Sequence, residues 1–126
     1  MSAGRLLDLI RAVGKRPGFY IVDPTRNGIS IWHLDAFLSG YQCGRQPPAE
    51  GDDILDALTF WVCIRYGLSA GSMNWCGHLW RRCGEDEEAA FRLFFELFDE
   101  YLGDWEQLGY EGIKSRYMQI IERQKE

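Results

Sequence analysis

Long uninterrupted apolar runs are absent from this 126-residue chain. No window approaches the roughly 18 apolar residues that a membrane-spanning helix needs. The apolar stretch near the N-terminus is interrupted by Asp8, Arg11 and Lys15, so it does not have the pattern of a signal peptide. We therefore expect a cytoplasmic protein that neither enters nor crosses a membrane.

Motifs that mark enzymes are also lacking. The 14 glycines form neither GxGxxG nor GxxxxGK, so no phosphate-cradling loop is predicted. No short pattern places a nucleophile beside its base. The acidic residues at 85–88 are adjacent at a helix start, whereas paired catalytic carboxylates need different environments within one cleft. We expect no catalytic residue and no cofactor.

The cysteines form neither a disulfide framework nor a zinc motif. Nothing in the sequence indicates export, so the four cysteines are expected to be reduced. The only cluster of metal-binding residue types is Cys76, His78 and Cys83, joined by Cys63 if the end of the preceding helix lies nearby. This cluster lacks the CxxC or HxxxH pair that presents two zinc ligands from one turn. We predict no metal site and keep a small thiol- or zinc-dependent enzyme as an alternative.

Apolar and aromatic residues, in contrast, are plentiful. They make up 46% and 14% of the chain, which is ample for a buried core. The length suits one domain, so residues 1–126 are expected to form a single helical domain.

Helical periodicity dominates the sequence, because apolar residues recur at three- and four-residue spacings. Ser30 is the expected N-cap of the second helix. The helix from Asp52 to Tyr66 is apolar around most of its circumference and therefore belongs in the middle of a bundle. The predicted fold is all-α, a compact bundle of about five helices around this central helix. We predict helices over residues 6–14, 31–43, 52–66, 85–102 and 113–121, and a shorter one within 73–83.

Turn-forming residues separate these helices. Pro17-Gly18 ends the first helix, and Phe19 to Val22 is expected to form a short extended segment. Trp32 lies opposite the apolar face of its helix, where it either packs against a second element or is exposed; we favour packing, because tryptophan usually buries most of its area. Further turns and loops are predicted at Asp23-Pro24, Asn27-Gly28, 44–51, 67–72 and 103–109, the last of which contains Trp105.

Negative charge is concentrated in one part of the chain, whose net charge is −5. Residues 84–111 contain ten acidic residues against Arg92 alone, a local charge of −9, while the flanking segments are neutral or basic. An acidic surface repels nucleic acids and attracts basic protein surfaces. The expected partner is therefore a protein with a basic surface, and no nucleic acid.

The helix predicted over 85–102 turns its aromatic residues inward and its acidic residues outward. A solvated helix face is the simplest explanation of the acidic side, within which Glu88 and Arg92 have the spacing of an ion pair. So large an excess of negative charge, however, lowers stability through self-repulsion. An aromatic side chain in the adjoining loop would also supply apolar area for binding a partner. We predict as partner-binding residues Glu85, Glu88, Glu96, Asp99, Asp104 and Trp105.

Four segments of the chain form a recognisable pattern: Arg16-Pro17-Gly18-Phe19-Tyr20, Ser30 to Tyr41, Gly84-Glu85-Asp86-Glu87 and Ala90 to Glu100. This pattern resembles a group of small bacterial proteins in which an RPGMYLG-type segment precedes a helix ending in FLxGY, and a later GDE precedes AFxxFFELxDE. Ile21-Val22 stands here where the group has Leu-Gly. Such proteins resemble the immunity proteins encoded beside polymorphic or contact-delivered toxins.

The resemblance implies a cytoplasmic inhibitor that binds one cognate toxin, occludes its active site or substrate groove, and catalyses nothing. It also implies that Arg16, Pro17, Gly18 and Tyr20 form a structural corner. We expect a monomer or weak dimer. A helical adaptor subunit that forms oligomers through Trp32 or Trp105 is a further alternative.

Overall fold

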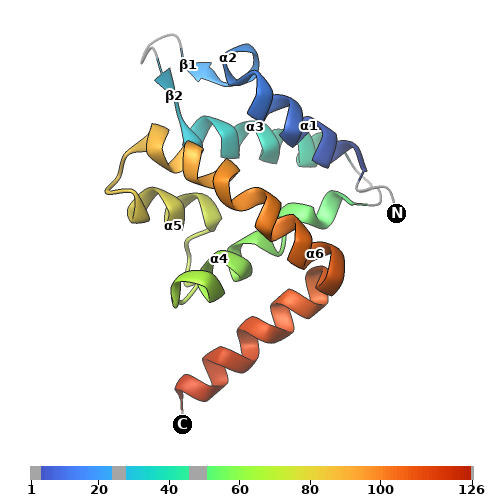
Figure 1. Ribbon diagram of the computed structural model, residues 1–126, viewed down its shortest axis with the longest axis vertical. Coiled ribbons are helices and arrows are strands. Elements are labelled where there is room, and N and C mark those ends of the chain that lie inside the picture. The colour runs from blue at the N-terminus through green and yellow to red at the C-terminus, as the bar shows by residue number, and fades with distance from the viewer. Residues whose placement is uncertain (1–3, 24–27, 46–50, 126) are drawn as a thin grey trace.

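The computed structural model describes residues 4–23, 28–45 and 51–125, and helices dominate it (Figure 1). The predicted all-α bundle is confirmed. The predicted turns at Asp23-Pro24 and Asn27-Gly28 each include a residue outside the described ranges, and most of the predicted loop 44–51 lies outside them. The elements are α1 (Gly4–Lys15), α2 (Pro17–Tyr20), β1 (Val22–Asp23), β2 (Gly28–Ile29), α3 (Ile31–Gly44), the 3₁₀ helix η1 (Asp52–Leu55), α4 (Leu58–Tyr66), α5 (Trp75–Arg82) and α6 (Glu87–Gln124).

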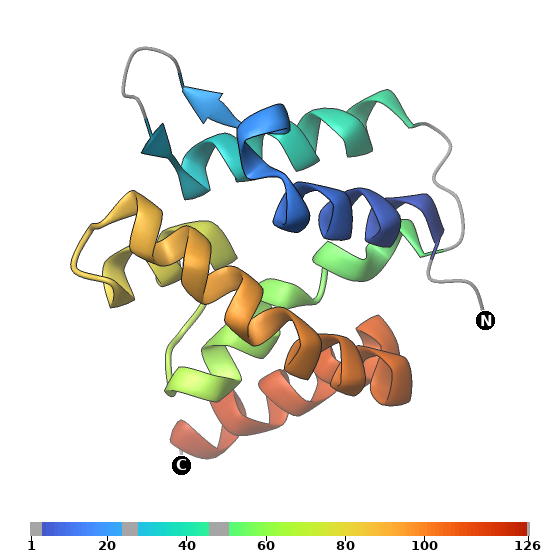
Figure 2. The same cartoon turned by 45° about the horizontal axis from the view of Figure 1, so that its top comes forward.

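The first half of α6 crosses the molecule between two groups of elements. Figure 1 shows α1 and α3 above it and α4 below it, and Figure 2 keeps this order after rotation. α6 packs against α3, α4, α5, η1 and β2, so it supplies a large share of the core. The largest fully buried side chains are those of Tyr101, Phe94, Leu6, Ile10, Ile31, Leu34, Leu38, Ile54, Leu79 and Ile113.

The helix predicted from Asp52 to Tyr66 is two elements instead of one. η1 begins after Gly51, whose φ of 84° is easily adopted only by glycine, and the α-helical part starts at Leu58. The hydroxyl of buried Tyr101 donates a hydrogen bond to the carbonyl oxygen of Ile54 in η1, next to the break. A contact with α6, 47 residues away in the chain, thus accompanies the change of helix type.

The loop predicted over residues 103–109 is wrong in its extent: α6 continues through residue 108, and the break between its two halves is confined to Gly109. Only Gly109 leaves helical geometry, with φ 67° and ψ −179°, and the helix bends there. Trp105 and Ile113, on either side of the bend, are both buried. Burial of these side chains overrides the weak helix propensity of the glycines, as tertiary packing often does.

The predicted extended segment Phe19 to Val22 begins later than expected. Phe19 and Tyr20 lie in the single turn of α2, because Pro17 at its start already has a helical φ. Extended backbone occurs at β1, where Val22 pairs with Ile29 in a two-residue antiparallel ladder.

The predictions for the start of α3 hold. Ser30 accepts a hydrogen bond from the Trp32 backbone N–H at 3.1 Å, which confirms the N-cap, and its hydroxyl donates to Glu87 at 3.1 Å. Trp32 packs edge-on against Trp80 with 5.4 Å between ring centroids, yet it remains 38% exposed. Both alternatives for this side chain are therefore partly correct.

Candidate functional site

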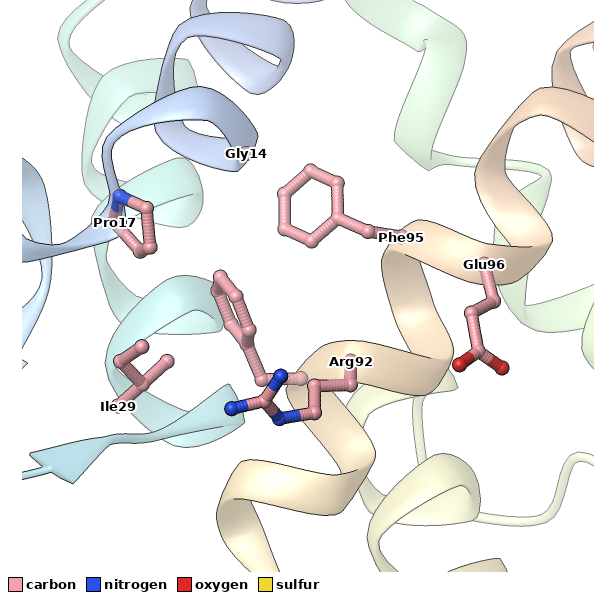
Figure 3. A pocket seen from close by; sticks show the side chains of 7 residues that line it. Gly14, Pro17, Ile29, Arg92, Phe95 and Glu96 are labelled. Atoms are coloured by element: carbon pink, nitrogen blue, oxygen red, sulfur yellow. The ribbon is translucent and has the colours of Figure 1, made fainter.

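A surface groove lies between the first half of α6 and the segment that joins α1 to α2 (Figure 3). Its volume is about 460 Å³, within the range of pockets that bind small ligands or single protruding side chains. Phe91 and Phe95 of α6 form an aromatic wall, and Arg92 and Glu96 add the only charged side chains of its lining. We call it the α6 groove; it is lined by Gly14, Pro17, Ile29, Phe91, Arg92, Phe95 and Glu96.

Gly14 allows the two sides of the groove to approach. A Cβ atom at this position would lie 2.7 Å from Cε1 of Phe95, closer than such carbon atoms come. Figure 3 shows the Phe95 ring directed at Gly14, with Pro17 and Ile29 on the same far wall. A larger residue at position 14 would therefore displace the ring and change the shape of the groove.

Of the four predicted corner residues, Pro17 lines this groove. The Arg16 carbonyl accepts from the Phe19 N–H at 3.0 Å, and the Pro17 carbonyl accepts from the Ile21 N–H at 2.9 Å, so the chain turns within five residues. Tyr20 packs on Phe37 of α3 with 5.8 Å between ring centroids. Pro17 of the RPG segment and Phe95 of the FFEL helix therefore line the same groove, although they are distant in the sequence.

The predicted acidic residues at the start of α6 lie at the surface. Glu85 precedes the helix with a φ of 66°, and Asp86 caps it by accepting from the Ala89 N–H at 3.0 Å. Glu88 accepts from Arg92 at 2.8 Å, which confirms the predicted ion pair. Both partners are more than half exposed, so this pair contributes little to stability.

Glu96 and Asp99 differ in their surroundings. Arg11 of α1 lies 3.5 Å from Asp99, and Arg65 of α4 pairs with neighbouring Glu100 at 2.7 Å. Glu96 is exposed, and within the described part of the chain it forms no ion pair. The arginines come from positions 88 and 35 residues away in the sequence, so no local pattern could reveal that they offset part of the acidic charge.

Asp104 and Trp105 have structural surroundings that differ from the predicted exposed loop. The Asp104 carboxylate accepts a 2.8 Å hydrogen bond from the indole N–H of buried Trp61. Trp105 is only 7% exposed and belongs to the apolar core. Because the segment is helical, the Trp105 ring faces inward, and it offers no exposed aromatic anchor.

Cys63 and His78 meet, with 3.6 Å between Sγ and Nε2. The same nitrogen lies 3.2 Å from the Ala70 carbonyl oxygen, which can only accept a hydrogen bond, so Nε2 carries the hydrogen in this contact. That nitrogen therefore cannot take a proton from the thiol. Burial also raises the pKa of Cys63, which keeps the thiol neutral and unreactive.

The remaining metal-binding residue types do not gather around this pair. Cys76 is buried, its thiol donates to the Ile31 carbonyl at 3.5 Å, and burial raises its pKa. Within residues 4–23, 28–45 and 51–125, no group of three or more His, Cys, Asp or Glu side chains is arranged to hold a metal ion.

The chain is thus an all-α protein, and among its described residues the α6 groove lies between α6 and the segment that joins α1 to α2. Comparison with protein families, with curated proteins and with solved structures finds no match. None of the helices in the described ranges combines the length and apolar character needed to cross a membrane.

Proposed function

We propose that this protein is an immunity protein that binds one bacterial toxin and blocks its active site or substrate groove. The observation that supports this proposal is the α6 groove, an apolar depression beside the unpaired carboxylate of Glu96. An apolar site with charges at its edge has the chemistry of a protein-binding surface, where the pocket holds an anchor and the charges orient the partner. The sequence resemblance supports the same role, which would be exercised in the cytoplasm.

The charge of the surface indicates the character of the partner. Arg11, Arg65 and Arg92 offset part of the acidic excess, whereas Glu96, beside the groove, forms no ion pair with a described residue. Exposed charge of this kind acts mainly on the rate of encounter, and salt screens it within about 10 Å. A toxin whose catalytic surface is basic, such as one that acts on nucleic acid, would be attracted to this face.

The proposal is tested with the toxin domain encoded beside the gene. We expect the wild-type protein to bind this domain in titration calorimetry and to protect cells that express it. The double variant Glu96→Lys, Asp99→Lys should associate about tenfold more slowly at low salt, with unchanged helical circular dichroism. The matched control is Glu111→Lys, Glu122→Lys, which makes the same change of charge after the Gly109 bend and should bind like the wild type.

The two possible failures can be told apart. Absence of binding and of protection by the wild-type protein would reject the immunity role. Equal association rates for the two double variants would reject the acidic face next to the groove as the contact surface, while leaving the role itself in place.

A further inference from the structure

A second cavity, distinct from the α6 groove, lies between α5 and the loop that precedes it. Its volume is about 570 Å³, and it is lined by residues 68–73 together with His78, Arg81 and Arg82 of α5. We call it the α5 cavity. It contains no acidic residue in its lining, although the whole chain has a net charge of −5.

Arg81 and Arg82, the two arginines of the α5 cavity, have guanidinium N–H groups available to bind a ligand. Neither forms an ion pair with any residue in the described ranges. Arg82 is held by Tyr66, whose ring centre lies 3.8 Å from the guanidinium carbon. A guanidinium stacked in this way keeps its N–H edges free for a ligand and loses less entropy when it binds one.

The serine side chains of the cavity are suited to an anion as well. His78 also lies in the cavity wall, but its Nε2 is hydrogen-bonded to the Ala70 carbonyl and is not free for a ligand. Ser69 and Ser72 bring hydroxyl groups that can donate. The lining therefore combines two positive charges with neutral hydroxyl donors.

We propose that the α5 cavity binds a small molecule that carries a phosphate group. A phosphate monoester has a charge between about −1.5 and −2 at neutral pH, which matches two guanidinium groups better than a single carboxylate does. Arginine forks also match the geometry of phosphate oxygens. The cavity exceeds the space that one anion needs and lies within the range of small-molecule pockets, so it accommodates an organic part in addition. This inference does not depend on the immunity role.

The test is an NMR titration of the isotope-labelled full chain at constant ionic strength. Ribose 5-phosphate should cause saturable shifts at residues 68–72 and at the end of α5, and ribose should cause none. Inorganic phosphate is titrated separately. If it causes the same shifts as ribose 5-phosphate at similar concentration, the phosphate group alone is the ligand. If its shifts are weaker, the organic part contributes to binding. Absence of saturable shifts with both phosphate compounds would overturn the proposal.

Variants separate a built site from diffuse attraction. Arg81→Gln, Arg82→Gln should weaken binding at least tenfold, which is the effect of losing about one charge-assisted hydrogen bond. The single variant Arg81→Gln leaves the contact between Arg82 and Tyr66 intact and should also weaken binding. It therefore serves as a test even if the double variant does not fold. Arg5→Gln, Lys15→Gln removes two exposed charges from α1, away from α5 in Figure 1, and should not change binding. Equal losses in the two double variants would overturn the site.

Discussion

Single polar side chains connect α6 to the elements around it. Asp104 accepts from Trp61 of α4, and Tyr101 donates to Ile54 of η1. Both hydrogen bonds involve buried groups, for which loss of the partner costs more than the bond itself contributes. These residues belong to the acidic, aromatic part of the sequence, but they act on the stability of the fold.

Replacement of Asp104 tests this structural role. In Asp104→Ala the buried Trp61 indole N–H loses its acceptor, so the free energy of unfolding should fall by about 1–3 kcal/mol. Glu106→Ala, an exposed acid two residues along the same helix, is the control and should change it by less than about 0.5 kcal/mol. Urea denaturation followed by fluorescence measures both. Equal stabilities of the two variants would contradict the importance of the Trp61 contact.

The four cysteines should differ in reactivity according to their burial. A thiol reagent should label exposed Cys43 first and partly buried Cys83 next. Cys63 and Cys76 are buried, which raises the pKa of each, so they should react only after unfolding. Mass spectrometry of the labelled native protein gives the order. Rapid labelling of Cys63 in the folded protein would contradict the inert thiol inferred from its geometry and revive the thiol-enzyme alternative.

At the scale of elements, α6 has two halves that meet at Gly109. Its φ of 67° and ψ of −179° fall in a region that only glycine occupies readily. The second half carries Tyr117, whose hydroxyl accepts from the Ala70 N–H at 2.9 Å and whose ring packs on Phe60. The bend therefore brings the C-terminal half of α6 back against α4 and the loop after it.

Two glycines of α6 should respond oppositely to substitution. Gly109→Ala forces a side chain into this strained conformation and should destabilise the protein by about 1–3 kcal/mol. Gly103→Ala is the matched control: a Cβ there meets no atom within 4 Å, so alanine should stabilise the helix by about 0.5–1 kcal/mol. Thermal unfolding measures the stability of both variants relative to the wild type. A stabilising Gly109→Ala would contradict the bend.

The sequence correctly predicted helix ends that are set by a residue at the end itself. Ser30 marks the start of α3 through its own side chain, and Pro17 marks the end of α1. The break within 52–66 was not predicted, because it accompanies a contact with an element distant in the sequence. A break between the last two helices was predicted over residues 103–109, but the structure confines it to Gly109. The α6 groove could not be predicted either, because its walls come from residues that are distant in the sequence, at 14–17, 29 and 91–96. The acidic residues were found by composition, but their pairing with Arg11 and Arg65 required the fold.

At the scale of the whole molecule, the core holds several weak acids in their neutral form. Burial raises the pKa of Tyr101, and nearby Asp53 and Asp56 raise it further. The buried thiols of Cys63 and Cys76 have raised pKa values for the same main reason. In the unfolded chain these groups ionise near pH 8.5 for thiols and near pH 10 for tyrosine. At alkaline pH the unfolded state therefore binds fewer protons than the folded state.

Stability should consequently fall as pH rises, first above about pH 8.5 and more steeply above about pH 10. Each group that stays neutral in the folded protein contributes a slope approaching 1.4 kcal/mol per pH unit once its unfolded form is ionised. Tyr101→Phe isolates one of them. This variant should be less stable at pH 7, because the Ile54 carbonyl loses its donor, but its stability should fall less steeply above about pH 10. Urea denaturation from pH 7 to 11 measures both curves; parallel curves above pH 10 would mean that Tyr101 ionises in the folded protein.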